Sequence, residues 1–267
     1  MIDLWLISLD KTQLSAALFL DLSAGFDVIP HFILIEKLRL YKFGNNSINW
    51  FKNYLNERFQ CVQVESCFSP FLPVPWGVPQ GSILGPLLFV IFIMELPDVL
   101  KDDSEIDQNE ENFIENNDAL DKKSEIVVYA DDNTPSAANK DPEVLQDIIE
   151  NDAKVVTDWF SKNEMITSGD KTKLLIIGTK SNRRHKLESQ NKTIKITVSN
   201  ETVKESFSEK LLGLIVNQNL TWQDHLHGND DNKGLLKELS QRIGILKKLR
   251  KYIPIKTLNS LSLVFHK

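Results

Sequence analysis

The stretch Tyr129-Ala130-Asp131-Asp132 constrains the fold more than any other part of this sequence. It follows Ile126-Val127-Val128, a β-branched run typical of a short buried strand, and it precedes Asn133-Thr134-Pro135, where turn residues take over. Because successive side chains of a strand point to opposite faces, adjacent carboxylates aim the same way only where the backbone turns. We therefore expect Asp131 and Asp132 at the apex of a hairpin.

Two neighbouring carboxylates repel each other, so a bound cation would stabilise the pair of Asp131 and Asp132. Hard oxygen ligands of this kind suit Mg²⁺ and also Mn²⁺. Taken alone, an Asp-Asp pair is far more often an ordinary acidic turn, because Asp is a favoured turn residue. The rest of the chain has to decide between the turn and a metal site.

Composition sets the broad class of the protein. A chain of 267 residues with 42% hydrophobic residues can bury a sizeable core in one or two domains. Cys61 and Cys67 have no partner at zinc-ligand spacing, which favours free thiols in a reducing compartment. The longest apolar run, 83–94, is interrupted by Gly85 and Pro86 and is too short to cross a bilayer. We expect a soluble, intracellular protein without a membrane partner.

The net charge of −6 argues against nucleic-acid binding if it is spread evenly, but it is not. Residues 98–125 contain eleven acidic residues and three lysines, and this density of charge predicts a disordered acidic insertion. Residues 229–267 contain nine Lys or Arg and three acidic residues. This basic end is either a surface for backbone phosphates or a solvated lysine-rich helix face.

Apolar periodicity predicts an α+β protein in which helices cover one face of an antiparallel sheet. Helices are expected at 2–9, 31–41, 47–55, 82–96, 142–161, 235–252 and 254–265, and strands at 16–20, 59–64, 71–74, 126–128, 173–177, 194–198 and 210–216, with a polar loop at 181–191.

Asp21 ends a buried strand, as the acidic pair does, so adjacent central strands would bring three carboxylates to one sheet edge. Three carboxylates can bind two Mg²⁺ ions that stabilise the attacking and leaving oxygens of an in-line phosphoryl displacement. Taken alone, Asp21 is equally well explained as an N-cap or turn residue.

Three segments resemble successive reverse-transcriptase motifs in the right order. They are Phe19-Leu20-Asp21-Leu22-Ser23-Ala24-Gly25-Phe26-Asp27, then Gly77-Val78-Pro79-Gln80-Gly81-Ser82-Ile83-Leu84-Gly85-Pro86, then Tyr129-Ala130-Asp131-Asp132. The second is a ten-residue match and is the most specific. The spacing of Trp50, Tyr54-Leu55, Arg58 and Gln60, and Leu220-Thr221-Trp222 followed by His225, resemble non-LTR retrotransposons of the LINE type, in particular jockey-like elements.

The resemblance covers almost the whole chain and implies a right-hand polymerase palm with partial fingers and a partial helical thumb. Residues 1–222 would form the palm with a remnant of the fingers, and residues 223–267 the partial thumb. The implied activity is that of an RNA-directed DNA polymerase, which adds dNTPs to a DNA primer 3′-OH on an RNA template with Mg²⁺. The family also implies a nuclear location or a cytoplasmic ribonucleoprotein.

The first and third motifs carry the implied catalytic centre. Asp21, Asp131 and Asp132 would hold the metal ions, with the Leu22 carbonyl beside them. Phe26 matches the aromatic steric gate, a rigid ring that leaves no room for a ribose 2′-OH. The alternative for Phe26 is a core phenylalanine.

Further motifs supply the implied nucleotide and primer contacts. Gln80 and Gly81 match the loop that contacts the incoming nucleotide and template, although the same residues also suit a plain helix-entry turn. Lys171 matches the lysine near the leaving pyrophosphate, where a cation stabilises developing charge. The alternative is that Lys171 is a solvated surface residue, as most lysines are. Leu212 and Gly213 resemble the primer-grip hairpin.

Some features depart from the family pattern. Ala24-Gly25 stands where Lys-Ala is common, and Ser168 where Asn is common. Most of the fingers is missing from the expected arrangement, so the alternative is an inactive, truncated remnant that at most binds RNA. A metal-dependent nuclease using the same carboxylates is a third, weaker reading.

Overall fold

The computed structural model describes residues 1–22, 24–56, 58–79, 81–100, 124–130, 132–190, 192–199, 201–229, 232–250 and 252. The chain forms two compact units, Met1–Ser206 and Phe207–Lys267. Two predicted site residues, Gln80 and Asp131, lie outside the described residues, as does 101–123 of the acidic segment. The helix expected at 254–265 also lies outside them.

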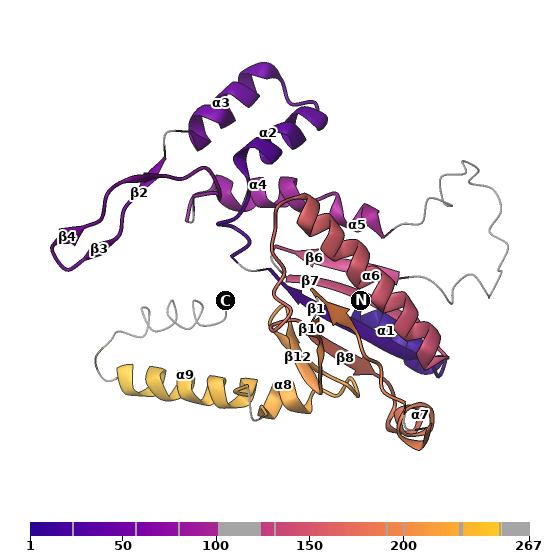
Figure 1. The fold of residues 1–267 in the computed structure, drawn as a ribbon. Helices are drawn as coiled ribbons and strands as arrows, with labels where there is room; N and C mark the ends of the chain where they lie inside the picture. Colours follow the sequence, from indigo (N-terminus) through magenta and orange to yellow (C-terminus); the bar gives the residue numbers. More distant parts are fainter. Residues whose placement is uncertain are drawn as a thin grey trace. The chain divides into compact units, whose positions relative to one another are not determined.

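The first unit is organised around a five-stranded sheet whose central strand is β1 (Figure 1). In sheet order the strands are β11 (Lys204–Ser206), β8 (Lys173–Ile177), β1 (Leu14–Asp21), β7 (Asp132–Asn139) and β6 (Ser124–Tyr129). β1 pairs antiparallel with both β7 and β8, and β11 pairs parallel to β8. β9 (Thr197–Val198) and β10 (Glu201–Thr202) form a separate antiparallel pair. The continuous apolar runs at 16–20 and 174–177 correctly predicted β1 and β8.

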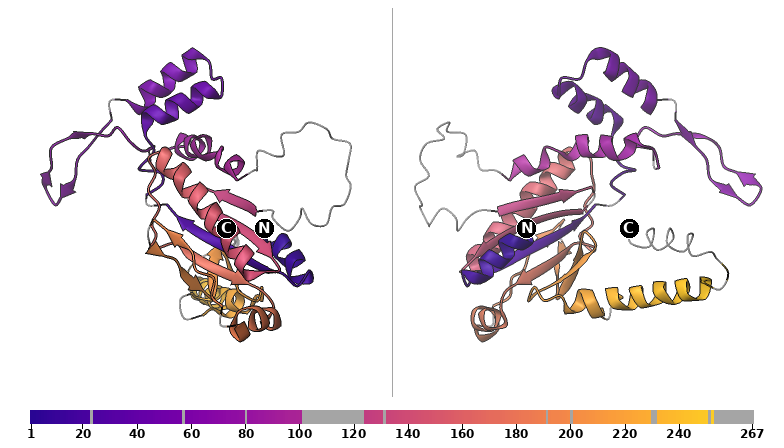
Figure 2. Two further views of the ribbon diagram at one scale, coloured as in Figure 1. Left: turned by 45° about the vertical axis from the view of Figure 1, so that its right-hand side comes forward. Right: turned by 180° about the vertical axis from the view of Figure 1, so that it is seen from behind.

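Two helices cover opposite faces of this sheet, as the two views of Figure 2 show. On one face lies α6 (Pro142–Lys162), which Asp141 caps by accepting a hydrogen bond from the Glu143 N–H at 2.9 Å. Its buried stripe includes Leu145, Ile149, Val156 and Phe160. Each such side chain contributes about 1.5–3 kcal/mol by leaving water. On the other face lies α1 (Ile2–Asp10), where the Trp5 indole N–H donates to the Ser136 hydroxyl at 2.7 Å.

Four further helices lie between β1 and β6 in the sequence: α2 (His31–Leu40), α3 (Asn45–Leu55), α4 (Leu84–Ile93) and α5 (Leu96–Val99). Asp98 and Val99, the start of the predicted acidic insertion, belong to α5, and its end, Ser124-Glu125, begins β6. The helix expected at 82–96 is divided into α4, which ends at Ile93, and α5, which begins at Leu96. The apolar residues of α4 pack into the same core as α2 and α6.

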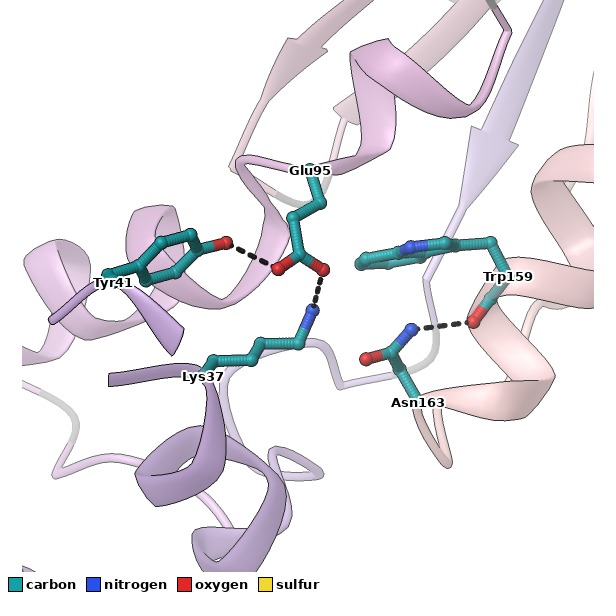
Figure 3. Close-up of polar contacts among 5 residues, drawn as sticks. All are labelled: Lys37, Tyr41, Glu95, Trp159 and Asn163. Atoms are coloured by element: carbon teal, nitrogen blue, oxygen red, sulfur yellow. Dashed lines mark hydrogen bonds and ion pairs between the residues drawn. The ribbon is translucent and has the colours of Figure 1, made fainter. Parts of the chain in front are cut away.

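A partly buried ion pair connects α2 to the turn after α4 (Figure 3). The Lys37 ammonium donates to Glu95 at 2.7 Å and lies 4.7 Å from the centre of the Trp159 ring, while the Tyr41 hydroxyl donates to the other Glu95 oxygen at 2.7 Å. Burial alone would raise the pKa of Glu95, but the hydrogen bonds from Lys37 and Tyr41 lower it. Burial and Glu95 raise the pKa of Tyr41. The ring and the carboxylate together stabilise a lysine that is only 6% exposed.

The strand pair between α3 and α4 differs from the prediction. Instead of one strand at 59–64 opposite 71–74, β2 (Phe59–Gln60) pairs with β5 (Leu72–Pro73), and β3 (Gln63–Val64) pairs with β4 (Cys67–Phe68). All four strands are exposed rather than half-buried. The ladder is interrupted where the Val62 N–H donates to the Ser69 hydroxyl at 2.8 Å.

Cys61 and Cys67 are free thiols, as predicted.

The turn predicted after the acidic pair is wrong. Asn133-Thr134-Pro135 does not begin a turn but continues β7, because Asn133 and Thr134 are buried between β1 and β6. Proline has no N–H to give to a ladder, and the β1–β7 register passes from Ala17↔Ser136 to Leu20↔Asn133. Tertiary burial here overrides local turn propensity.

The polar loop expected at 181–191 is largely helical. It contains α7 (Lys180–Lys186) and a 3₁₀ turn at Glu188–Gln190. Thr179 caps α7 by accepting from the Asn182 N–H at 3.1 Å. At the other end of α7, the Lys186 ammonium donates to the carbonyls of Thr12 and Lys140 at 2.9 and 2.6 Å. Contacts with carbonyls so distant in the sequence cannot be predicted from local apolar periodicity.

The second unit begins with a hairpin of β12 (Ser208–Leu211) and β13 (Leu214–Asn217), followed by α8 (Gln223–His227) and α9 (Leu235–Leu249). Asn217 stabilises the connection to α8, since its amide donates to Thr221 at 2.8 Å and to Asp224 at 3.0 Å. The palm-to-thumb boundary expected between residues 222 and 223 falls within this unit and stays a prediction. No helix in the described ranges is long and apolar enough to span a membrane.

Candidate active site

The central strand ends at a carboxylate that faces a second carboxylate. Asp21 is the last residue of β1 and is the register partner of Asp132, the first residue of β7. Residues directly opposite in an antiparallel pair have Cβ atoms about 4.5–5.5 Å apart on the same side of the sheet. Alternation along β1 and β7 places both carboxylates on the face that carries Ser136 and Trp5, opposite α6.

A tight turn brings Asp132 to this edge. Tyr129 of β6 pairs with Asp132 of β7, so only positions 130 and 131 join the two strands. Ala130 has a φ of 52°, the left-handed backbone that two-residue hairpin turns require. Asp131 itself lies outside the described residues. A hairpin apex is thus present where the sequence predicts one, but Asp132 is the first residue of β7 and not part of the turn.

Lys171 lies beside Asp21, with its ammonium nitrogen 3.4 Å from a carboxylate oxygen. The loop that carries it is tied to the end of β1, because the Ser168 N–H donates to the Asp21 carbonyl at 3.1 Å and Leu22 bridges to Thr167. Thr172 closes the loop, since its hydroxyl donates to the Ser168 carbonyl at 2.7 Å. The structure therefore brings together Asp21, Leu22, Asp132 and Lys171.

Phe26 lies on the turn that follows β1. The backbone turns where Ala24 has a φ of 55° and the Asp27 N–H donates to the Ala24 carbonyl at 2.8 Å. The half-buried ring of Phe26 stacks on Phe89 of α4, with centroids 4.5 Å apart and planes at 28°. Stacking of this kind contributes about 0.5–1.5 kcal/mol and holds the ring in one orientation. Both earlier readings, gate and core residue, are compatible with a ring that is packed on one side.

The loop 76–81 is bonded to this turn. The Gly77 and Val78 N–H groups donate to the carbonyls of Ile29 and Phe26 at 2.8 and 2.9 Å. Gly77 has a φ of 77°, and a Cβ there would lie 2.7 Å from the Asp27 carbonyl oxygen. Only glycine permits this approach. Gly81 also has a left-handed φ of 79°, with open space around it, whereas Gln80 lies outside the described residues.

Sequence reasoning gave no role to the two side chains that hold Gly77. The His31 Nε2 lies 2.7 Å from the Gly77 carbonyl oxygen, and the Arg58 guanidinium donates to the same oxygen at 3.3 Å. Burial lowers the pKa of His31, the Gly77 hydrogen bond partly opposes this, and the charge of Arg58 lowers it further. A neutral His31 that donates from Nε2 fits these surroundings. No local motif signals the contact, because residue 31 is 46 positions away in the chain.

Leu212 and Gly213 form the turn of the β12–β13 hairpin in the second unit. Their φ values are 48° and 89°, and Leu211 pairs with Leu214 across them. Consecutive left-handed residues are typical of a type I′ turn. The leucine side chain at the tip is 48% exposed.

Carboxylates supply the donor set for a metal ion at this edge of the sheet. Among the described residues, which leave out Asp131, no group of three or more His, Cys, Asp or Glu side chains is arranged to hold a metal ion. Asp21 and Asp132 are nonetheless paired hard oxygen donors on one side of a sheet, and this chemistry suits Mg²⁺. The two described carboxylates fit a divalent ion.

A family model described as reverse transcriptase (RNA-dependent DNA polymerase) matches residues 6–225 of the chain. The chain belongs to the reverse transcriptase family. This confirms the resemblance that the three motifs carry, and the mixed helix-and-sheet architecture confirms the predicted palm-type α+β fold.

Similar proteins place this member of the family with the reverse transcriptases of non-LTR retrotransposons. It is 36% identical over 88 residues to the probable RNA-directed DNA polymerase from transposon BS of Drosophila melanogaster, a match of 33% of this chain and 10% of that protein. It is 24% identical over 220 residues to the RNA-directed DNA polymerase from mobile element jockey of Drosophila funebris, covering 82% of this chain and 21% of that protein. The chain thus spans only a small part of these relatives.

The solved structure of apo telomerase from Candida tropicalis, truncated from the C-terminal domain, shares the fold of this reverse transcriptase chain. The TM-score is 0.50 at 15% identity, over 83% of this chain and 38% of that one. At this identity the likeness concerns the fold alone.

Proposed function

We propose that this chain is the palm portion of an RNA-directed DNA polymerase that adds dNTPs to the 3′-OH of a DNA primer on an RNA template. The observation that carries the proposal is the register pair of Asp21 and Asp132 at the end of the central strand, with Lys171 beside it. Carboxylates paired in this way in the reverse transcriptase fold suit two-metal nucleotidyl transfer. Residues 1–222 are assigned to the palm with a remnant of the fingers, and residues 223–267 to a partial thumb.

Asp21 and Asp132, with Asp131 from the same motif, would hold Mg²⁺, or Mn²⁺ in its place. Bound there, the ions would supply charge stabilisation to the attacking and leaving oxygens of the phosphoryl transfer. The Leu22 carbonyl follows Asp21 in the chain and is assigned to the same neighbourhood. Two like charges directly opposite in a sheet destabilise the fold, so their pairing is better explained by function than by stability.

The remaining residues position the substrates and balance charge. Lys171, whose side chain is 67% exposed, is free to leave the Asp21 carboxylate and to contact the leaving pyrophosphate, where it would stabilise charge and donate a proton. The Phe26 ring, fixed by Phe89, would lie below the sugar and exclude a 2′-OH. Gln80 and Gly81 would contact the incoming nucleotide, and the hairpin tip at Leu212 and Gly213 the primer.

Primer extension tests the proposal. The full chain is incubated with a DNA primer annealed to an RNA template, dNTPs and Mg²⁺, beside the variant Asp132→Asn and the control Asp158→Asn, which replaces an exposed carboxylate on α6. Template-directed incorporation that Asp132→Asn abolishes and Asp158→Asn leaves intact would support it. Absence of incorporation with the RNA still bound would favour a noncatalytic RNA-binding remnant. Cleavage of nucleic acid without dNTPs would favour a nuclease.

A further inference from the structure

A groove of about 770 Å³ lies between α2, the end of α3 and the β2–β5 strand pair. Its volume is within the range of roughly 300–1,000 Å³ that ligand sites in proteins occupy. We call it the Phe59 groove, lined among others by Phe32 and Arg39 of α2, Lys52 of α3, Arg58, Phe59 of β2 and Pro75. None of these residues is one of the predicted catalytic or nucleotide-binding residues.

The charge of the Phe59 groove is positive. Arg39, Lys52 and Arg58 line it, and Glu36 is the one acidic residue in its described lining. Glu36 forms an ion pair with Arg39 across one turn of α2, which leaves the other two cations in excess. His31 also lines the groove, and an imidazole carries no negative charge in either protonation state. A groove with this excess attracts a polyanion.

Two aromatic rings line the same groove. Phe32 and Phe59 are 61% and 59% exposed. Exposed rings next to cations are typical of surfaces on which single-stranded bases stack, because every base offers a π face. A duplex hides its bases, so rings of this kind favour an unpaired strand.

We propose that the Phe59 groove binds a single-stranded segment of nucleic acid, with backbone phosphates on Lys52 and Arg58 and a base on Phe59. RNA is the expected strand, and that choice alone rests on the proposed function. The exposed rings and the excess of cations fit a nucleic acid better than an apolar peptide, which has no charge to pair with Lys52 and Arg58.

The groove is connected to the loop at 76–81 through one oxygen. Arg58 lines the groove and also donates to the Gly77 carbonyl at 3.3 Å, where His31 makes a second contact. The loop continues to Gly81 of the nucleotide-binding motif. A phosphate that engages Arg58 therefore lies next to the backbone that positions this motif.

Fluorescence anisotropy with a labelled eight-nucleotide oligouridylate measures the binding directly. The full chain carries Asp132→Asn, and EDTA is present without dNTPs, so that the result does not depend on catalysis. Phe59→Ala should weaken binding about fivefold or more, the scale of one lost base stack. Lys52→Gln should lower the slope of log affinity against log salt by about 0.7, the value for one lost phosphate contact on a single strand.

Matched controls separate the groove from other surfaces. Phe68→Ala removes a ring on the neighbouring β4 that is 63% exposed and does not line the groove, and Lys154→Gln removes an exposed charge on α6. Both should leave affinity and salt slope unchanged, and all four variants should melt like the parent because their side chains are not buried. Equal effects of Phe59→Ala and Phe68→Ala would overturn the proposal.

The choice of strand is read from a second oligonucleotide. Tighter binding of oligouridylate than of oligothymidylate assigns the groove to RNA, and the reverse assigns it to DNA; either result requires the loss with Phe59→Ala. If Phe59→Ala and Lys52→Gln bind both oligonucleotides as the parent does, the proposal that the Phe59 groove binds nucleic acid is overturned, whatever the outcome of primer extension. If primer extension fails while Phe59→Ala still weakens binding and Lys52→Gln still lowers the salt slope, only the proposed polymerase activity is overturned.

Discussion

Asp21 at the end of β1 lies directly opposite Asp132 at the start of β7. Like charges in this position destabilise a sheet by about 0.2–1 kcal/mol, and Lys171 at 3.4 Å offsets part of the repulsion. The pair is therefore a place where the fold carries charge that it does not need for stability. A functional role for the pair therefore predicts that a substitution lowers activity without lowering stability.

Asp21→Asn should abolish primer extension and leave the protein at least as stable as before. A neutral amide holds a divalent ion far more weakly than a carboxylate, so incorporation should fall by about 100-fold or more, the scale of losing a group that stabilises charge in a transition state. Thermal unfolding should show an unchanged or slightly higher Tm, because one of two facing charges is gone. A marked loss of stability would show that Asp21 is a structural residue.

Lys171→Gln should slow incorporation without unfolding the protein. Its ion pair with Asp21 is exposed, 67% for the lysine and 42% for the aspartate, and contributes about 0–1 kcal/mol. The single-turnover rate of incorporation should fall, because no lysine side chain then stabilises the charge of the leaving pyrophosphate or donates a proton to it. Lys154→Gln serves as the control on an exposed helix face. Equal rates for the two variants would remove Lys171 from the mechanism.

Phe26→Ala should raise the use of ribonucleotides relative to deoxyribonucleotides. The ring fills the space below the proposed sugar position, and its removal makes room for a 2′-OH. The variant also loses the stack on Phe89, so Tm should fall modestly. The ratio of incorporation rates for paired rNTP and dNTP reports the effect. A ratio equal to that of the parent in an active variant would mean that Phe26 is only a packing residue.

Gly77→Ala should destabilise the protein more than any other glycine substitution at the site. An alanine would combine a left-handed φ of 77° with a Cβ 2.7 Å from the Asp27 carbonyl oxygen. Gly81→Ala has a comparable φ of 79° but open space, so it should cost only the conformational strain, about 1–2 kcal/mol. The free energies of unfolding in urea separate the two effects, because Gly81→Ala adds only backbone strain and Gly77→Ala adds a steric clash as well. Equal free energies of unfolding would contradict the close approach.

Much of this fold follows from local signals in the sequence. The buried run that forms β1 and the Asp141-Pro142 start of α6 have the periodicity and capping that define such elements. β7 and α7 were missed because distant partners decide them: β7 lies between β1 and β6, and Lys186 anchors α7 to the carbonyls of Thr12 and Lys140. Local propensity does not report such partners.

The candidate site divides in the same way. The prediction that Asp21 and the acidic pair come to one sheet edge agrees with the Asp21↔Asp132 register. The strand next to β1 is, however, β7, which begins at Asp132, and not β6, which precedes the pair. The contacts of His31 and Arg58 with the Gly77 carbonyl could not be predicted, because they depend on how α2 and the β2–β5 pair fold back on the loop. Their roles, like those of the other site residues, stay predictions until the variants are measured.

Asp152 should make stability depend on pH in the direction opposite to an ordinary carboxylate. This residue of α6 is 4% exposed, and burial raises its pKa to about 6, while a hydrogen bond from the Ser124 hydroxyl at 3.3 Å partly opposes the rise. Its other carboxylate oxygen has no hydrogen-bond partner among the described residues. A raised pKa in the folded state means that folding favours the protonated form.

The contribution of Asp152 is therefore most favourable below the unfolded pKa of 3.8 and is lost as the pH rises through about 6. The shift corresponds to a penalty of about 3 kcal/mol at pH 8, since each pKa unit is about 1.4 kcal/mol. Asp152→Asn, which cannot ionise, should raise the free energy of unfolding at pH 8 and change it little at pH 4. Urea unfolding at both pH values, with Asp158→Asn as the exposed control, measures the difference. A parent and variant whose stabilities run parallel from pH 4 to pH 8 would show that Asp152 is ionised in the folded protein without penalty.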